Sequence, residues 1–200
     1  MMADRLYFSC DPGEADAYRA AFEKSFGHLF VARVSALNEL PGDTAARYIE
    51  ALRRGGFIDS SMVVVVLVSR GTPASRRIDW DIAAGLEPDA QGRVAGLLGI
   101  MLPDVPRRVA DDAGPLPVPF FDYSSMPPRL ADNVKSGYAR IYDWHWLCSD
   151  EARVVEALRF AQATQQQRAQ YADNSRLRLT YDLPFAVRAV APDRERRRNP

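Results

Sequence analysis

The sequence is poor in the residues from which metal centres and disulfide frameworks are built. Among its 200 residues it has two cysteines, Cys10 and Cys148, and two histidines, His28 and His145. The two cysteines are far apart in the chain and lack the close spacing typical of metal ligands or of small disulfide-bonded domains. The sequence therefore predicts no metal site, and it predicts thiols that stay reduced, as in the cytoplasm.

Net charge and long apolar runs are lacking as well. Lysine and arginine together number 26, as do aspartate and glutamate, so the formal net charge is zero at pH 7. Such a chain lacks the overall positive field typical of proteins that bind nucleic acid or anionic membranes. The longest apolar run, residues 62–68, has seven residues, whereas a membrane-spanning helix needs about 20. Because residues 1–5 begin no apolar signal core, we expect a cytoplasmic protein that binds neither membrane nor nucleic acid.

Short catalytic motifs are missing too. The sequence contains no GxGxxG, no Walker motif, no HExxH and no GxSxG. With two histidines in the chain, the side chain most often used as a general acid or base is scarce. Candidate functional residues must therefore be found from the order of the predicted strands and helices.

What is present is an alternation of short apolar strands and amphipathic helices. Residues 62–68 include four consecutive valines without polar alternation, which is typical of a strand that is buried on both faces. In the second helix we expect Ala46, Ile49 and Leu52 to form the buried face. The expected strands are 6–9, 29–34, 62–68 and 94–102, and the expected helices are 14–26, 43–54 and 76–86. This alternation predicts a doubly wound parallel α/β sheet.

The pattern changes after residue 102. Seven of the 14 prolines lie between residues 103 and 128, which predicts an extended surface connection. A long helix is expected over residues 151–171, and its polar second half should project or pack on another chain. Residues 177–180 and 185–190 are expected to form a hairpin. We divide the chain into a domain at 1–103, a proline-rich and aromatic connection at 104–149, a C-terminal helix and hairpin at 150–192, and a disordered tail at 193–200.

In doubly wound sheets the ligand lies in a crevice outside the carboxyl ends of the strands. The segments that follow the expected strands are residues 9–11, 36–38, 69–75 and 103–104. The helix that begins near Ser75 places Asp79 and Asp81 close to the same edge. An acid in the first turn of a helix is ordinarily explained by the helix dipole, which suits Asp79. Because Asp81 lies further along, it is the better candidate for a functional carboxylate.

Four segments around this edge resemble a known family. They are LYFS at 6–9, IDSS at 58–61, SRRIDWDI at 75–82 and GLLGI at 96–100. Together they are similar to the TIR-like domain of bacterial Thoeris antiphage systems, in which a serine-bearing loop and an S-R-x-V-x-W/Y-E-I helix precede a G-L-L-G-I strand. The resemblance covers about residues 4–103, and residues 128–139 resemble a downstream element of some members.

This resemblance implies a flavodoxin-like, TIR-type fold that cleaves the nicotinamide glycosidic bond of NAD, with NAD as substrate and no other cofactor. The family's glutamate falls on Asp81, which becomes the expected catalytic carboxylate, and its first-strand Phe-Ser falls on Phe8 and Ser9. Aspartate is one methylene shorter than glutamate, so we expect Asp81→Glu to preserve or raise activity and Asp79→Asn to be tolerated. The expected NAD-binding residues are Phe8, Ser9, Asp11, Ser69, Ser75 and Arg76.

The resemblance also implies partners. The product would be an ADP-ribose-derived signalling nucleotide that a downstream effector senses, a phage-derived trigger would start its production, and the protein would form a homo-oligomer. Two alternatives stay open at this point. One is a catalytically silent TIR-like adaptor or assembly module, and the other is a nucleoside or nucleotide-sugar hydrolase on the same fold, because a fold does not fix a function.

Overall fold

Five parallel strands form the centre of the molecule. The computed structural model describes residues 4–13, 15–33, 43–105 and 122–182. The strands are β1 (Asp4–Ser9), β2 (Phe30–Arg33), β3 (Val63–Val68), β4 (Gly96–Met101) and β5 (Arg140–Asp143), and they lie in the order β2-β1-β3-β4-β5. Every neighbouring pair is parallel. This order is that of flavodoxin-like sheets, so the expected doubly wound α/β class is confirmed.

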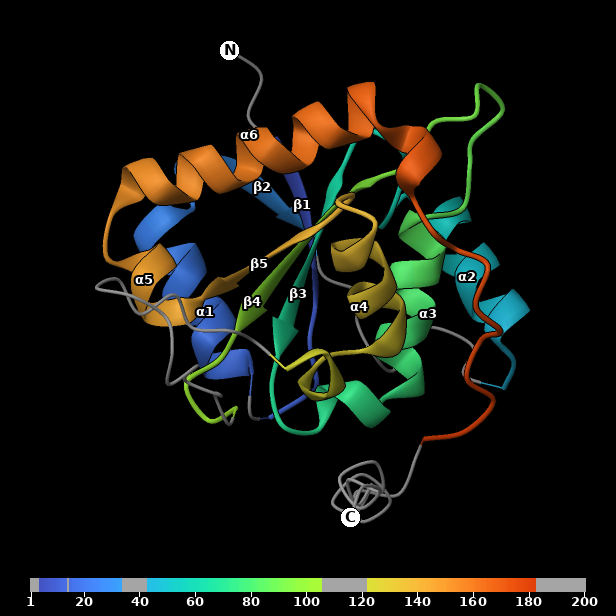
Figure 1. The fold of residues 1–200 in the computed structure, drawn as a ribbon, viewed down its shortest axis with the longest axis horizontal. Coiled ribbons are helices and arrows are strands. Elements are labelled where there is room, and N and C mark those ends of the chain that lie inside the picture. The colour runs from blue at the N-terminus through green and yellow to red at the C-terminus, as the bar shows by residue number, and fades with distance from the viewer. Residues whose placement is uncertain (1–3, 14, 34–42, 106–121, 183–200) are drawn as a thin grey trace, which may run out of the picture.

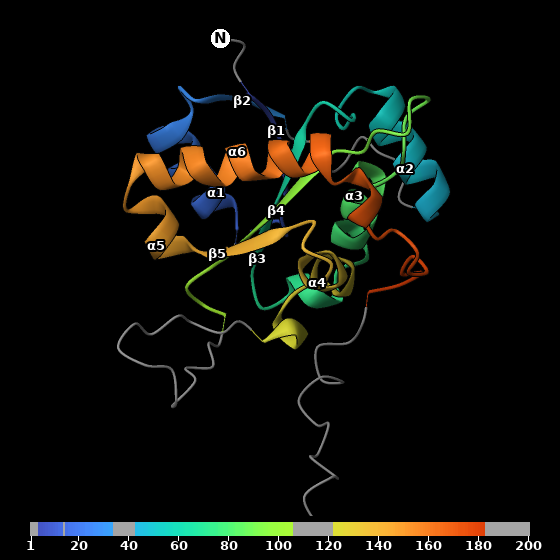
Figure 2. The ribbon, with the colours of Figure 1, turned by 45° about the horizontal axis from the view of Figure 1, so that its top comes forward.

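Helices cover both faces of the sheet (Figure 1). One face carries α2 (Ala45–Arg54), α3 (Arg76–Gly85) and α4 (Pro128–Lys135), and the other carries α1 (Asp16–Phe26), α5 (Trp144–Cys148) and α6 (Glu151–Gln167). Three short 3-10 helices are η1 (Thr72–Ala74), η2 (Tyr123–Ser125) and η3 (Ala169–Tyr171). Figure 2 shows α6 crossing one side of the sheet while α3 and α4 pack on the other.

The valine strand β3 lies in the middle of the sheet, as its unbroken apolar run predicts. All six of its residues are buried. Val64, Val66 and Val68 contribute to the core under α2, α3 and α4, and the alternate residues contribute to the core under α1, α5 and α6. Two separate cores on one strand explain why its sequence shows no polar alternation.

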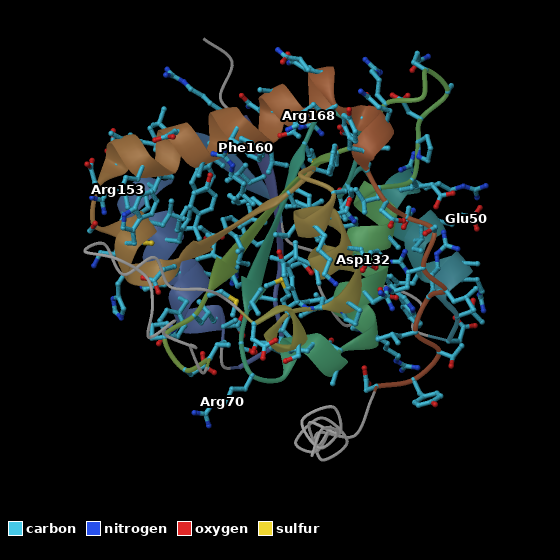
Figure 3. The ribbon with its side chains drawn as sticks, in the orientation of Figure 1. Glu50, Arg70, Asp132, Arg153, Phe160 and Arg168 are labelled. Carbon is cyan, nitrogen blue, oxygen red and sulfur yellow. The ribbon has the colours of Figure 1, made fainter. Side chains whose placement is uncertain are left out.

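The helix α6 packs very closely on β4. A side chain at Gly96 would place its Cβ atom 2.8 Å from the carbonyl oxygen of Ala161, so only glycine fits there. Figure 3 shows Arg153 and Arg168 toward the two ends of α6, with Phe160 between them. The guanidinium of Arg140 on β5 lies 3.8 Å from the centre of the Phe160 ring. No helix in the described part of the chain is long and apolar enough to cross a membrane.

Several sequence predictions need correction. The buried face of α2 carries Tyr48, Ile49 and Leu52, while Ala46 is exposed. Neither β5 nor α5 was predicted from the sequence, and both form within the aromatic segment at 138–148. The polar end of α6 does not project, because the Gln165 amide donates to the carbonyl of Ser60.

The predicted C-terminal hairpin receives no support from its first half. Residues 177–180 are described and are not a strand. Its second half at 185–190 and the tail at 193–200 lie outside the described residues. Residues 36–38, which the topology places near the crevice, lie outside them as well.

Candidate active site

At the carboxyl edge of β1, a buried carboxylate accepts hydrogen bonds from three hydroxyl groups. Asp81, in the second turn of α3, accepts a hydrogen bond from the Ser9 hydroxyl at 2.7 Å. Its other oxygen accepts from the Tyr48 hydroxyl at 2.9 Å and from the Tyr7 hydroxyl at 3.1 Å. The donors come from β1 and α2, so three elements meet at one side chain. Asp81 is only 5% exposed.

Burial dominates the electrostatics of this carboxylate. Removal from water raises the pKa of Asp81 from 3.8 to about 6, because the low dielectric disfavours the charged form. Hydrogen bonds from Ser9, Tyr48 and Tyr7 oppose the rise, and so does the positive charge of Arg77. The side chain is therefore mostly ionised at neutral pH and becomes neutral in mildly acidic solution. Such a carboxylate can stabilise a nearby positive charge or exchange a proton.

The tyrosine on α2 is held by neighbours on α3. The Tyr48 ring lies 5.4 Å from the Trp80 ring, and the Arg77 guanidinium lies 5.2 Å from the centre of the Tyr48 ring. Both Tyr48 and Trp80 are almost fully buried. Packing on Trp80 and Arg77 therefore fixes the position from which the Tyr48 hydroxyl donates to Asp81.

The structure separates two adjacent residues of the predicted site. Ser9 faces Asp81, but Phe8 points to the other side of the sheet, as successive strand residues do. The Phe8 ring packs 5.8 Å from the Phe22 ring and 5.9 Å from the Phe30 ring, and it is 2% exposed. Phe8 is therefore a core residue and has no exposed surface that a nicotinamide ring could stack on.

The loops after β1 and β3 meet at the carboxyl edge of the sheet. A Cβ atom at Gly71 would lie 3.3 Å from a carboxylate oxygen of Asp11, which is closer than most Cβ contacts. Ser69 is fully buried, and its backbone N–H donates to the Thr72 hydroxyl at 2.8 Å. Asp11 therefore lies against the loop after β3, and Ser69 holds that loop in shape.

The thiol that follows β1 is a poor nucleophile. Burial is the main cause that raises the pKa of Cys10 to about 11. At neutral pH the group is a protonated thiol, which does not attack carbon. The described residues contain no group of three or more histidine, cysteine or acidic side chains that could hold a metal ion.

A C-terminal segment, residues 172–182, runs along α3 and reaches its first turn; we call it the C-terminal strap (Figure 1). Ser75 precedes α3 without a side-chain capping bond. The Asp182 carboxylate takes that role, since it accepts from the Arg76 backbone N–H at 2.8 Å. The Arg76 guanidinium lies 5.3 Å from the centre of the Trp80 ring. Arg76 therefore contacts the strap, Ser75 directly precedes Arg76, and no hydrogen bond within the described residues joins either of them to Asp81.

Asp79 plays a different part from the one expected. Its carboxylate pairs with the guanidinium of Arg129 on α4 at 2.9 Å, and both side chains are buried. It also accepts from the backbone N–H of Leu179 in the strap at 2.9 Å. This pair speaks against the expectation that Asp79→Asn is tolerated, because the change would leave a buried guanidinium without its counter-charge.

Sequence reasoning missed both tyrosines that donate to Asp81. Tyr7 could have been found, because it lies two residues before Ser9 and strand periodicity puts both on one face. Tyr48 lies four residues before the buried Leu52, which is also consistent with a shared helix face. No pattern in the sequence joins Tyr48 to Asp81, since 33 positions separate them.

The parallel sheet in flavodoxin-like order, with a buried carboxylate at its carboxyl edge, is consistent with an α/β domain of the TIR type. Comparison with protein families gives one match. Residues 38–107 are similar to the family model described as Thoeris protein ThsB, TIR-like domain. The matched region runs from before α2 to after β4 and includes both Tyr48 and Asp81.

Comparison with individual proteins adds no further relative to the family match. Neither the curated proteins nor the solved structures compared with the chain give a match. The family match supports a role for the chain as a TIR-like protein of antiphage defence.

Proposed function

We propose that this chain cleaves the nicotinamide glycosidic bond of NAD and that Asp81 is the carboxylate that faces the ribose. The observation that carries the proposal is the buried carboxylate at the carboxyl edge of β1, inside the region that matches the ThsB family. Ligands of doubly wound sheets bind at this edge. NAD is the substrate, and the reaction needs no further cofactor.

The chemistry requires negative charge near the reacting sugar. When the bond between the ribose C1′ and the nicotinamide nitrogen breaks, both electrons leave with nicotinamide, which becomes neutral. The ribose then carries positive oxocarbenium character. An ionised Asp81 would stabilise this charge, and burial strengthens the effect. Water would then add to C1′ and release a proton, or a nucleophilic group of the ADP-ribose itself would add and close a ring.

The hydroxyl groups around Asp81 set the conditions for binding. A carboxylate offers about four acceptor positions, and Ser9, Tyr7 and Tyr48 occupy three of them. A ribose hydroxyl would take the remaining position or replace one tyrosine hydroxyl. The longer side chain of a glutamate at position 81 would clash with the three hydroxyl donors. We now expect Asp81→Glu to be less active and less stable than the natural protein.

The same observation favours a second candidate, a catalytically silent adaptor. Asp81 is 5% exposed and already accepts three hydrogen bonds, as a carboxylate with a purely structural role would. In that case the TIR-like domain would act in antiphage defence through assembly with other chains.

Release of nicotinamide from NAD separates the two candidates. The purified protein is incubated with NAD, with and without a lysate of phage-infected cells, beside Asp81→Asn and the exposed control Asp43→Asn. We expect release by the natural protein and by Asp43→Asn, and none by Asp81→Asn. If all three are inert under every condition, the adaptor candidate replaces the enzyme.

The proposal extends to partners. The product would be an ADP-ribose-derived nucleotide messenger that a downstream effector senses, and a phage-derived component would trigger its formation. We also propose that the protein acts as a homo-oligomer. Light scattering at increasing protein concentration, with and without NAD, tests the oligomer, and a monomer in every sample would contradict it.

A further inference from the structure

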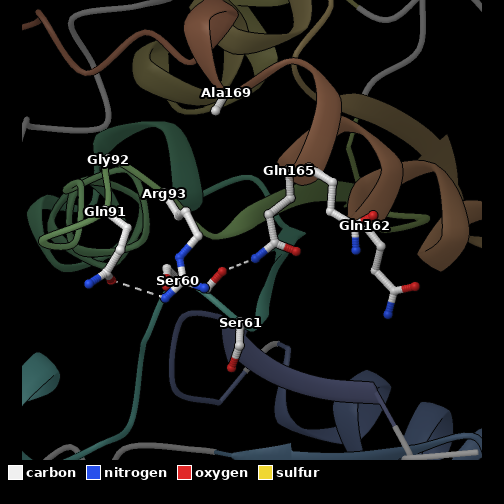
Figure 4. A pocket seen from close by; sticks show the side chains of 9 residues that line it. Ser60, Ser61, Gln91, Gly92, Arg93, Gln162, Gln165 and Ala169 are labelled. Carbon is white, nitrogen blue, oxygen red and sulfur yellow. Dashed lines mark hydrogen bonds between the residues drawn. The ribbon is translucent and has the colours of Figure 1, made fainter.

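A cavity of about 610 Å³ lies at the amino ends of β3 and β4. Three segments that are distant in the sequence line it: residues 60–61 before β3, residues 91–93 before β4, and residues 162–169 of α6 and η3 (Figure 4). Asp81 lies at the opposite, carboxyl edge of the sheet. The cavity is therefore separate from the candidate active site.

One wall of the cavity is organised by a single carboxylate. Asp89 accepts from the Ser60 hydroxyl at 2.7 Å and from the backbone N–H of Gln91 at 2.8 Å. It also accepts from the backbone and the side chain of Arg93, at 2.9 and 2.8 Å. These donors, with the Ser60 bond first, lower the pKa of Asp89, so the carboxylate stays charged. The wall is held in place before any ligand arrives, which reduces the entropic cost of binding.

The facing wall is a row of amides on α6. Gln162, Gln165 and Gln166 are spaced so that they share one face of the helix. The Gln165 amide donates to the Ser60 carbonyl and so joins the two walls. The amides of Gln162 and Gln166 make no hydrogen bond to any other residue that the structure describes. Each offers two donors and one acceptor oxygen, which a ligand can use.

The cavity has a mixed polar and apolar lining that carries no unpaired charge. Residues 160–167 contain no charged side chain, although 26% of the whole chain is charged. The one cation of the lining, Arg93, pairs with Asp89 at 2.8 Å. A solvated helix face ordinarily carries charged residues, so a row of amides here favours an uncharged, hydrogen-bonding ligand over plain solvent.

We propose that this cavity binds a neutral ring compound with adjacent hydroxyl groups. Adjacent hydroxyls each donate and accept, and the amides of Gln162 and Gln166 match both functions. The volume falls within the range of roughly 300–1,000 Å³ typical of small-molecule sites. The ribose of a nucleoside and a free saccharide share this chemistry.

Titration with adenosine and, separately, with glucose tests the proposal and distinguishes the two sources. The readout is the side-chain amide signals of the glutamines in nitrogen-correlated NMR spectra. We expect saturable shifts of the Gln162 and Gln166 signals with one of the probes. Loss of two neutral hydrogen bonds in the double variant Gln162→Leu, Gln166→Leu should weaken binding about tenfold or more.

Gln167→Leu is the matched control, because Gln167 lies on the same helix and does not line the cavity. It should bind like the natural protein, and unchanged backbone signals would show that each variant is folded. Asp81→Asn should also bind normally, so loss of NAD cleavage and loss of this site are separate results. The proposal is overturned if neither probe shifts these signals, or if Gln167→Leu weakens binding as much as the double variant.

Discussion

At the scale of single residues, the most informative side chain is Asp81, because its burial disfavours its negative charge. Burial raises its pKa to about 6, although three hydroxyl groups donate to it. In the unfolded chain the pKa returns to its ordinary value near 3.8. Between these two pH values the folded protein holds a proton that the unfolded chain releases.

The first prediction concerns the effect of this proton on stability. The neutral form of Asp81 favours the folded state, and this contribution is lost as the pH rises through about 6. Relative to Asp81→Asn, the natural protein should therefore lose stability between pH of about 4 and 7, by roughly 3 kcal/mol. Urea unfolding of both proteins across this range measures the difference. A difference that does not vary with pH would show that Asp81 titrates as it does in water.

The second prediction concerns the buried ion pair between Asp79 and Arg129. Asp79→Asn removes one charge and leaves the other buried, which should cost about 3–5 kcal/mol in the free energy of unfolding. Asp132→Asn is a matched control, since its partner Arg176 is 44% exposed and its loss should cost less than about 1 kcal/mol. Equal losses in urea unfolding would contradict this account of the pair.

At the scale of elements, the central strand depends on two apolar faces. Val65 on β3 is fully buried and Val31 on β2 is 49% exposed. Val65→Asp should unfold the domain, because an unpaired buried charge costs several kcal/mol against a total stability of about 5–15 kcal/mol. Val31→Asp should remain folded. Circular dichroism during heating compares them, and a normal melting curve for Val65→Asp would contradict the central placement of β3.

The C-terminal strap fixes the position of α3. The Leu179 backbone donates to the Asp79 carboxylate at 2.9 Å, and its carbonyl accepts from the Trp80 indole at 2.7 Å. Leu179→Pro removes the backbone N–H that donates to Asp79. The loss should lower the free energy of unfolding by about 1.5–3 kcal/mol, the range typical of hydrogen bonds to charged groups. Leu177→Pro should cost less than about 1 kcal/mol, because Leu177 is 89% exposed and makes no bond within the described residues. Chemical denaturation that ranks the two variants the other way would contradict this role.

The sequence predicted elements better than contacts between elements. The four-valine run defined a central strand because burial on both faces leaves no polar position. In contrast, β5 has only four residues and lies at an edge, where its burial pattern is mixed, so no apolar run marks it. Residues 177–180 resemble a strand in composition. In the folded chain, however, the Leu179 backbone bonds to side chains of α3 and not to another strand.

At the candidate active site too, contacts between elements were harder to predict than the elements themselves. Topology placed Ser9 and Asp81 at one edge of the sheet, and the structure joins them at 2.7 Å. The predicted position of Phe8 followed the resemblance to the family, whereas strand alternation puts its ring in the opposite core. The Arg129 partner of Asp79 and the Tyr48 partner of Asp81 depend on how helices pack across the sheet, and sequence spacing does not determine this.

At the scale of the whole molecule, the two edges of the sheet have different chemistry. The carboxyl edge carries a buried carboxylate within the ThsB-like region, and the amino edge carries a neutral, amide-lined cavity. Because the length of the sheet separates them, substitutions at one edge should leave binding at the other unchanged.

The central claim is that an ionised Asp81 drives the cleavage of NAD. Its most direct test is the pH dependence of kcat/KM for nicotinamide release. We expect kcat/KM to rise through a pH of about 6 and then to reach a plateau. In Tyr48→Phe the same rise should occur at a higher pH, because the variant lacks one donor that lowers the pKa of Asp81. Release that does not vary with pH, or that persists at the natural rate in Asp81→Asn, would contradict it.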